Sequence, residues 1–149
     1  MTSVDDVKKL REMTGCGIGD CQKALTEAAG DFDVARKKLQ ERGAEMLEKK
    51  SERMTNQGII ETYTHGAGKI GVMLEMRCET DFVARNEEFK VLAHDIALHI
   101  IALNPQSVEG LLSQEYVKDS SLTIKNLIDK AVAKFGENIK IEKFVRYEL

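Results

Sequence analysis

The periodicity of the apolar residues changes at Gly58, and this change limits the possible folds more than any other feature of the sequence. Beyond it, "GIIETYT" and "IGVMLEMRCE" alternate apolar with polar residues on either side of "HGAGK", a turn-forming segment. A period of two around a Gly-containing turn is typical of a β-hairpin. The residues expected on one face of the second strand are Ile70, Val72, Leu74, Met76 and Cys78.

Before the hairpin, the apolar residues have helical spacing. Residues 1–43 are predicted to form a three-helix, UBA-like module (like a ubiquitin-associated domain), in which Val34, Ala35 and Leu39 face inward. Residues 44–57 carry many charges and only a thin apolar stripe, which favours a solvated helical connector. The caps and stops expected to delimit the helices of the module are Ser3 with Asp6, Gly15, Gly30, Asp31 and Gly43.

After the hairpin, helical spacing returns but leaves the start of the next helix open. Apolar residues recur at helical spacing from Phe82 to an end near Asn104, which precedes a proline. Asn86, followed by two glutamates, can equally be the N-cap, and residues 80–85 would then form a projecting turn. In the first case Phe82 is a core aromatic residue, and in the second it is free to contact a partner.

The rest of the chain predicts two more helices and a strand. Residues 106–121 are polar, with a short helix around 108–112, and residues 122–135 form a helix that stops at Gly136. The tail residues expected on one face of a third strand, with Lys143 interrupting, are Ile139, Ile141, Val145, Tyr147 and Leu149. The predicted fold class is α+β: behind the helical module and connector, residues 58–149 form a small core domain, whose antiparallel sheet (hairpin plus C-terminal strand) packs on helices.

Charge and composition argue against several classes of protein. The 22 Lys and Arg against 25 Asp and Glu give a net charge of -3 without a basic block, so direct binding of nucleic acid is not expected. No apolar run approaches the ~20 residues that span a bilayer, and the N-terminal sequence lacks the pattern of a signal peptide. We therefore expect a cytoplasmic protein without membrane attachment.

The candidate chemical residues do not predict an enzyme, a metal site or a cofactor. The three cysteines include no CxxC pair and the three histidines are scattered, so neither a disulfide framework nor a zinc site is expected. "TGCGIGD" lacks the preceding strand and the following GK[ST] of a phosphate loop, and no nucleophile, base and acid form a catalytic arrangement. A small thiol enzyme that uses Cys78 beside Asp81 is an alternative, and it predicts sensitivity to alkylation.

Three stretches resemble the elongation factor Ts family. "LREMTGCGIGDCQKAL" (Leu10–Leu25) is similar to its N-terminal signature, "CETDFVARN" (Cys78–Asn86) to its second signature, and "FGENIKIEKFVRYEL" to its C-terminal pattern. The family commonly has two core subdomains and a protruding helical hairpin, whereas this chain is expected to have one core and only the short segment 106–121. The resemblance therefore implies a short form that pairs as a homodimer, in which a second copy supplies the missing half-core.

The resemblance also implies a function. It implies binding to the GTPase elongation factor Tu in its GDP form and faster GDP release, by disturbing the site that holds Mg²⁺ and the phosphates. The residues that match the inserted motif are Thr80, Asp81, Phe82 and Val83. The residues that match the partner-binding N-terminal motif are Arg11, Ile18, Gly19 and Lys23, with Ile18 and Gly19 where many members carry two methionines.

A function from another class is also open. Three-helix modules of about forty residues commonly bind small folded proteins, so a ubiquitin-type or scaffold protein-binding module without exchange activity is the alternative. It predicts that residues 1–43 alone hold the partner and that guanine nucleotide has no effect.

Overall fold

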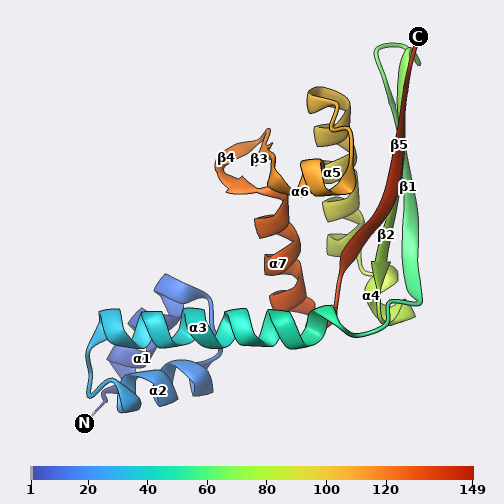
Figure 1. Ribbon diagram of the computed structural model, residues 1–149. Helices are drawn as coiled ribbons and strands as arrows, with labels where there is room; N and C mark the ends of the chain where they lie inside the picture. Colours follow the sequence, from blue (N-terminus) through green and yellow to red (C-terminus); the bar gives the residue numbers. More distant parts are fainter. Residues whose placement is uncertain (1) are drawn as a thin grey trace. The chain divides into compact units, whose positions relative to one another are not determined.

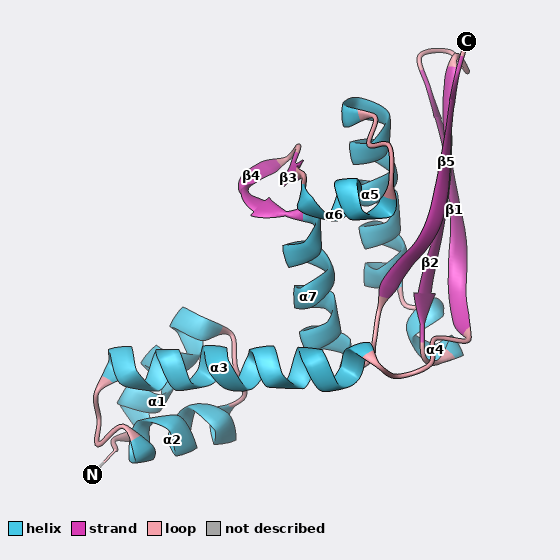
Figure 2. Cartoon of the chain, in the orientation of Figure 1, coloured by secondary structure: helices cyan, strands magenta, loops and turns pink. Residues whose placement is uncertain are grey.

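The computed structural model describes residues 2–149. The chain divides into two compact units, Met1–Glu48 and Lys49–Leu149. The first is helical, and the second combines helices with antiparallel strands (Figures 1 and 2). The predicted α+β class, with an antiparallel sheet packed on helices, is confirmed.

Two short helices and most of a longer one form the first unit. α1 (Val4–Thr14) begins with the predicted capping box, in which Ser3 and Asp6 exchange side-chain and backbone hydrogen bonds, and it ends at Gly15 in the left-handed region. α2 (Ile18–Glu27) follows after a short turn. The residues buried between the helices are Val7, Leu10, Cys21, Ala24, Leu25, Ala28, Ala35 and Leu39.

The predicted cap of the third helix is confirmed. α3 (Phe32–Ser51) starts where the Asp31 carboxylate accepts hydrogen bonds from the backbone N–H groups of Asp33 (2.9 Å) and Val34 (3.0 Å). The Val34 side chain is 44% exposed, so its predicted inward orientation is wrong. Of the three residues predicted to face inward, Ala35 and Leu39 are buried in the core.

The expected helix end at Gly43 is also wrong, because α3 continues past it. Glycine in a helix interior costs only about 1 kcal/mol relative to alanine, and Gly43 lies among good helix formers and keeps a negative φ. The expected helical connector over 44–57 is correspondingly helical only to the end of α3. Residues 52–56 are turn and loop, and the first strand begins at Gln57.

The sheet of the second unit has three antiparallel strands in the order β1-β2-β5. The predicted hairpin is present as β1 (Gln57–His65) and β2 (Ile70–Cys78), and the predicted tail strand as β5 (Lys140–Glu148). The five residues expected on the inner face of β2 are buried or half-buried. A Cβ on Gly58 would lie 2.1 Å from the carbonyl oxygen of Met76, so only glycine allows β1 this close to β2.

A β-bulge changes the face on which the end of β5 presents its side chains. Met76 pairs with Ile141, but the preceding Glu75 pairs with Lys143, so β5 has one extra residue at this point. Because side chains alternate along a strand, every later residue moves to the opposite face, and Phe144 turns inward opposite a buried leucine. The residues wrongly predicted to share a face with the buried Ile141 are Val145, Tyr147 and Leu149, all of which are exposed.

Two helices form further layers on one face of the sheet (Figure 2). α5 (Glu87–Leu103) packs on β1 and β2, and α7 (Ile124–Phe135) packs on α5 through an edge-to-face contact between Phe89 and Phe135, with ring centroids 6.4 Å apart. Arg146, on the inner face of β5, donates to the carbonyl oxygen of Ile101 (3.1 Å) near the end of α5. The fully buried residues of α5 are Phe89, Ala93, Ile96, Ala97, His99 and Ile100.

The segment between α5 and α7 contains the predicted short helix and a hairpin that was not predicted. α6 (Val108–Ser113) is followed by β3 (Glu115–Tyr116) and β4 (Asp119–Thr123), which pair with each other. Strands of two and five residues with polar side chains are too short to show an alternating pattern in the sequence.

A buried histidine fixes this hairpin to α5. The Nδ1 atom of His99 accepts a hydrogen bond from the backbone N–H of Val117 (3.2 Å). Its Nε2 atom must therefore carry the proton, which it donates to Oε1 of Gln114 (2.9 Å). Burial lowers the pKa of His99 below its usual value, so the ring is neutral at neutral pH.

This lowered pKa predicts that the second unit loses stability in mild acid. As the pH falls below the ordinary histidine pKa of ~6.5, the unfolded chain binds a proton that the folded His99 does not yet accept, so the free energy of unfolding decreases until the folded pKa is reached. The decrease is at most about 1.4 kcal/mol per pH unit. Urea unfolding of wild type and His99→Gln between pH 7.5 and 5 measures it, with His65→Gln at the exposed end of β1 as the control.

An equal pH dependence of wild type and His99→Gln would contradict this assignment.

Among residues 2–149, none of the helices combines the length and the hydrophobicity that a membrane span requires.

Candidate functional site

The chain makes a single helical turn between β2 and α5. Thr80 is its N-cap, and the Thr80 hydroxyl oxygen accepts a hydrogen bond from the backbone N–H of Val83 (3.4 Å) at the start of α4 (Asp81–Ala84). Asn86 then caps α5, accepting from the backbone N–H of Glu88 (2.8 Å). Of the two helix starts that the sequence allowed, the one at Asn86 is therefore correct.

Phe82 projects from this turn into solvent. Its side chain is 90% exposed, whereas the next residue, Val83, is 8% exposed. Val83 and Ala84 occupy the inward positions of α4 and anchor the turn on the core, which leaves Phe82 on the outward side. The alternative in which Phe82 is a core aromatic residue is wrong, because its side chain is exposed; the aromatic residue that α5 buries is Phe89.

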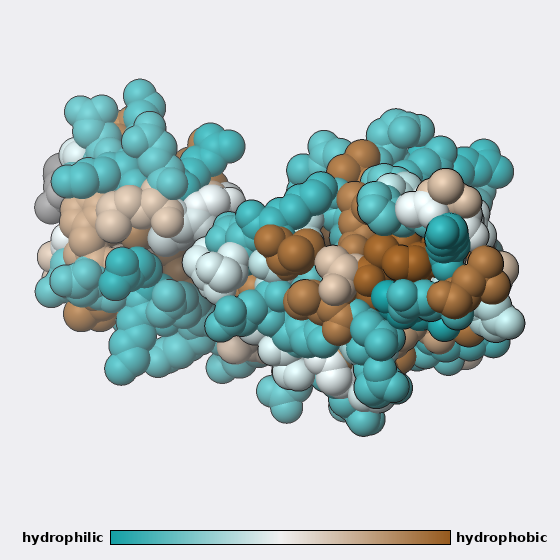
Figure 3. Space-filling view, turned by 90° about the horizontal axis from the view of Figure 1, so that it is seen from above, coloured by the Kyte–Doolittle hydropathy of each residue, from teal (hydrophilic) through white to brown (hydrophobic). Residues whose placement is uncertain are grey.

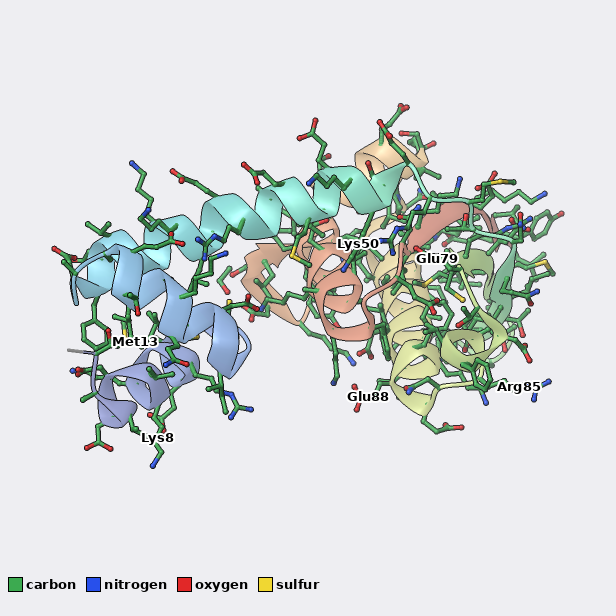
Figure 4. All side chains as sticks on the ribbon, turned by 90° about the horizontal axis from the view of Figure 1, so that it is seen from below. Lys8, Met13, Lys50, Glu79, Arg85 and Glu88 are labelled. Carbon is green, nitrogen blue, oxygen red and sulfur yellow. The ribbon has the colours of Figure 1, made fainter. Side chains whose placement is uncertain are left out.

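An ion pair closes the outer side of the turn. Nη2 of Arg85 lies 2.8 Å from Oδ2 of Asp81, and both side chains are more than half exposed. Figure 4 shows Arg85 pointing away from the body of this unit. An exposed pair of this kind contributes less than about 1 kcal/mol to stability, so both charges are available to a partner.

Glu137, between α7 and β5, holds the inner side of the turn. Its Oε1 atom accepts hydrogen bonds from the backbone N–H groups of Glu79 (3.2 Å) and Thr80 (3.0 Å). Its Oε2 atom accepts from the Thr80 hydroxyl at 2.6 Å. Glu137 was not among the predicted site residues, although it lies in the tail stretch that carries the family resemblance.

Cys78 cannot serve as the nucleophile of a thiol enzyme. Its side chain is fully buried, and its Sγ atom donates to the backbone oxygen of Thr80 (3.2 Å). Burial, together with the negative charge of Glu137, raises the pKa of the Cys78 thiol to about 11, so the reactive thiolate is absent at neutral pH. The described residues also contain no group of three or more His, Cys, Asp or Glu placed to hold a metal ion.

The second group of predicted site residues lies around the α1–α2 turn of the first unit. Arg11, Ile18, Gly19 and Lys23 are all exposed, and Ile18 is the first residue of α2. Near the end of α1, Met13 is 52% exposed, similar to Ile18 at 57%. Met13 was not among the predicted site residues, although a methionine two residues before the glycine stop was the available signal.

Two comparisons with known proteins identify the family. The family described as "Elongation factor TS" matches residues 79–149, which include the turn, Glu137 and β5. Elongation factor Ts of Herpetosiphon aurantiacus is 41% identical over 192 residues, covering 99% of this chain and 97% of that protein. The chain belongs to the elongation factor Ts family. It is thus a translation elongation factor of the Ts type, with a role in protein biosynthesis.

Other elongation factor Ts proteins show how this chain differs in length. That of Thermotoga maritima is 41% identical over 190 residues and is covered to 96%. That of Aquifex aeolicus is 47% identical over 151 residues, but only 52% of it is covered. The alignment with the Herpetosiphon protein has 192 positions against 149 residues here, so elongation factor Ts of that organism has at least 43 residues without a counterpart in this chain.

Proposed function

We propose that this protein binds GDP-bound elongation factor Tu and accelerates the release of GDP. The observation that carries the proposal is Phe82, an aromatic side chain that is 90% exposed on a turn anchored by the buried Val83 and Ala84. An aromatic residue held outward on a fixed support is suited to enter a pocket of a partner protein. The translational role of the family supports elongation factor Tu as that partner, and the proposed place of action is the cytoplasm.

The proposed mechanism is displacement of the groups that hold Mg²⁺ and phosphate. Nucleotide affinity in such GTPases depends on Mg²⁺ coordination and on a backbone cradle around the phosphates. Insertion of Phe82, with Asp81 and Thr80 beside it, moves the loops of elongation factor Tu that hold Mg²⁺ and the phosphates. GDP thereby loses several strong contacts. Each 1.4 kcal/mol lost is about tenfold in affinity. Because binding free energies are reciprocal, GTP entry weakens the complex to the same extent and releases the exchange factor.

The first unit is proposed to dock on the same partner. Ile18 and Met13 supply exposed apolar surface near the α1–α2 turn, and Arg11, Lys23 and the uncovered backbone at Gly19 lie in the same motif. This unit provides affinity, whereas the turn of the second unit provides the exchange activity.

Release of fluorescently labelled GDP from elongation factor Tu, measured with and without this protein, tests the proposal. We expect the release rate to rise with its concentration and to saturate. A release rate that stays at the intrinsic value would overturn the exchange function and favour a scaffold or ubiquitin-type binding module.

We also propose that two copies pair through the uncovered face of the sheet. Side chains of cross-strand neighbours lie on the same face of a sheet. On the face that points away from α5, Met73 pairs with Val145. Ile60 and Tyr147 lie on the nearest rungs of this same face, one on either side of that pair. These four side chains are 49–72% exposed, and Figure 3 shows hydrophobic atoms at the surface of this unit. Stacking two such sheets removes this apolar surface from water and completes a two-layer core.

Pairing predicts a solution mass of about twice 16.7 kDa at micromolar concentration. Met73→Lys places a charge in the middle of the proposed interface and is expected to give a single-chain mass with unchanged circular dichroism. The matched control is Val117→Lys, because Val117 is also 49% exposed but lies in the β3–β4 hairpin. Light scattering that finds only single chains in wild type would refute the pairing.

A further inference from the structure

Two carboxylates connect the turn that carries Phe82 with the loop between α7 and β5, and each accepts hydrogen bonds from the backbone of the opposite segment. Glu137 accepts from the backbone of Glu79 and Thr80, and in the opposite direction Oε1 of Glu79 accepts from the backbone N–H of Asn138 (2.8 Å). Each carboxylate therefore pairs with backbone N–H groups of the opposite segment. We call this arrangement of Glu79 and Glu137 the carboxylate latch.

The latch also orients the hydroxyl group of Thr80 that caps α4. A hydroxyl group has one proton, and that of Thr80 goes to Oε2 of Glu137 at 2.6 Å, the length of a charge-assisted bond. The lone pairs of the Thr80 oxygen remain available to the backbone N–H of Val83. Glu137 therefore determines how the first residue of the turn is oriented.

A second layer of contacts fixes the latch to the end of α3. Nδ2 of Asn138 donates to the carbonyl oxygens of Arg53 (2.8 Å) and Ser51 (3.4 Å), and Nη1 of Arg53 lies 3.5 Å from Oε1 of Glu79. Asn138 is only 6% exposed, so these bonds are protected from water. Figure 4 shows Glu79 near the C-terminal end of α3, consistent with this pairing.

We propose that Glu137 is a positioning residue for nucleotide exchange: with Glu79, its carboxylate fixes the turn so that Phe82 already points outward when the partner arrives. This inference rests on the proposed exchange function. A helix of four residues is not stable by itself, because the first turn fixes several residues for a single hydrogen bond. Fixing the turn in advance means that binding does not have to order it, which favours insertion of the aromatic ring.

The test compares Glu137→Ala and Glu137→Gln with Glu109→Ala, which removes the same side chain from an exposed position on α6. Amide hydrogen exchange of residues 79–84 is measured in the free chain, and GDP release is measured over a range of chain concentrations. Glu137→Ala is expected to exchange these amides about tenfold faster and to lower the maximal GDP release rate about tenfold, as for loss of a hydrogen bond to a charged group. The half-saturating concentration should change less than about threefold.

The glutamine variant separates positioning from a general loss of structure. Its amide oxygen can still accept from both backbone N–H groups, so Glu137→Gln is expected to recover most of the protection and of the maximal rate. Should Glu137→Ala fail to fold, Glu137→Gln carries the test with intermediate values of both quantities.

Three outcomes overturn the proposal: wild-type amide protection in Glu137→Ala, a wild-type maximal rate in that variant, or an equal effect of Glu109→Ala. A wild-type chain without exchange activity would overturn the proposed function and with it the catalytic consequence of the latch. Hydrogen exchange in the free chain would still decide whether Glu137 holds the turn, so the two failures are distinguishable.

Discussion

Phe82→Ala is expected to slow GDP release about 30-fold or more at saturating concentration and to leave the melting temperature within ~2 °C of wild type. The side chain is 90% exposed, so its truncation removes almost no packing from the folded chain. A ring inserted into a partner is a typical hot spot, worth about 2 kcal/mol or more. Stopped-flow release of labelled GDP and thermal unfolding followed by circular dichroism measure the two quantities.

Phe89→Ala is the contrasting variant. Phe89 lies seven residues further on, is fully buried and packs edge-to-face on Phe135. Its truncation is expected to cost about 3–5 kcal/mol of stability. Asp81→Ala should slow GDP release less than Phe82→Ala, since Asp81 is an exposed partner of Arg85 and water can replace a polar contact.

A Phe82→Ala variant that melts many degrees lower would show that the ring packs on the chain itself. One that releases GDP at the wild-type rate would show that the ring does not enter the partner's nucleotide site. The combination of normal stability and slow release is the result that insertion of the Phe82 ring into the partner requires.

Helix boundaries were predictable where local chemistry determines them. The capping box of Ser3 and Asp6, the Asp31 cap and the stops at Asn104 and Gly136 all depend on hydrogen bonds or backbone angles within about four residues. A short window of sequence contains everything that decides such a boundary.

Features that depend on a distant partner were not predictable in this way. The bulge of β5 is visible only in its register with β2, so Lys143 interrupted the pattern without showing that Val145 and Tyr147 change face. Gly43 resembles a stop, but nothing in its surroundings requires the left-handed conformation that would end α3 there.

The candidate site also has one part that local sequence indicates and another that depends on a distant contact. Asn86, followed by two glutamates, allowed an exposed Phe82 without deciding for it, and the family resemblance favoured that alternative. Glu137 supports the turn from 57 residues away, and no local pattern announces a contact of that kind. Its role follows only from the packing of the α7–β5 loop against the end of β2.

Ile18→Asp is expected to raise the half-saturating concentration for GDP release about tenfold or more and to leave the maximal rate unchanged. Ile18 and Met13 are the exposed apolar side chains near the α1–α2 turn, and docking would bury them. A carboxylate at this position would have to lose its water on binding without gaining a partner. Ile18 is the first residue of α2, where a negative charge suits the helix dipole, so the fold itself is not weakened.

Val4→Asp is the matched control for this prediction. Val4 is also an exposed apolar residue, 71% exposed, and is also the first residue of its helix, so both variants make the same change of charge in the same helical context. If the two variants weaken binding equally, the effect is one of net charge on the unit. If neither does, docking does not use the α1–α2 turn. A shift confined to Ile18→Asp, beside a fall in maximal rate confined to Phe82→Ala, would assign affinity to the first unit and exchange to the second.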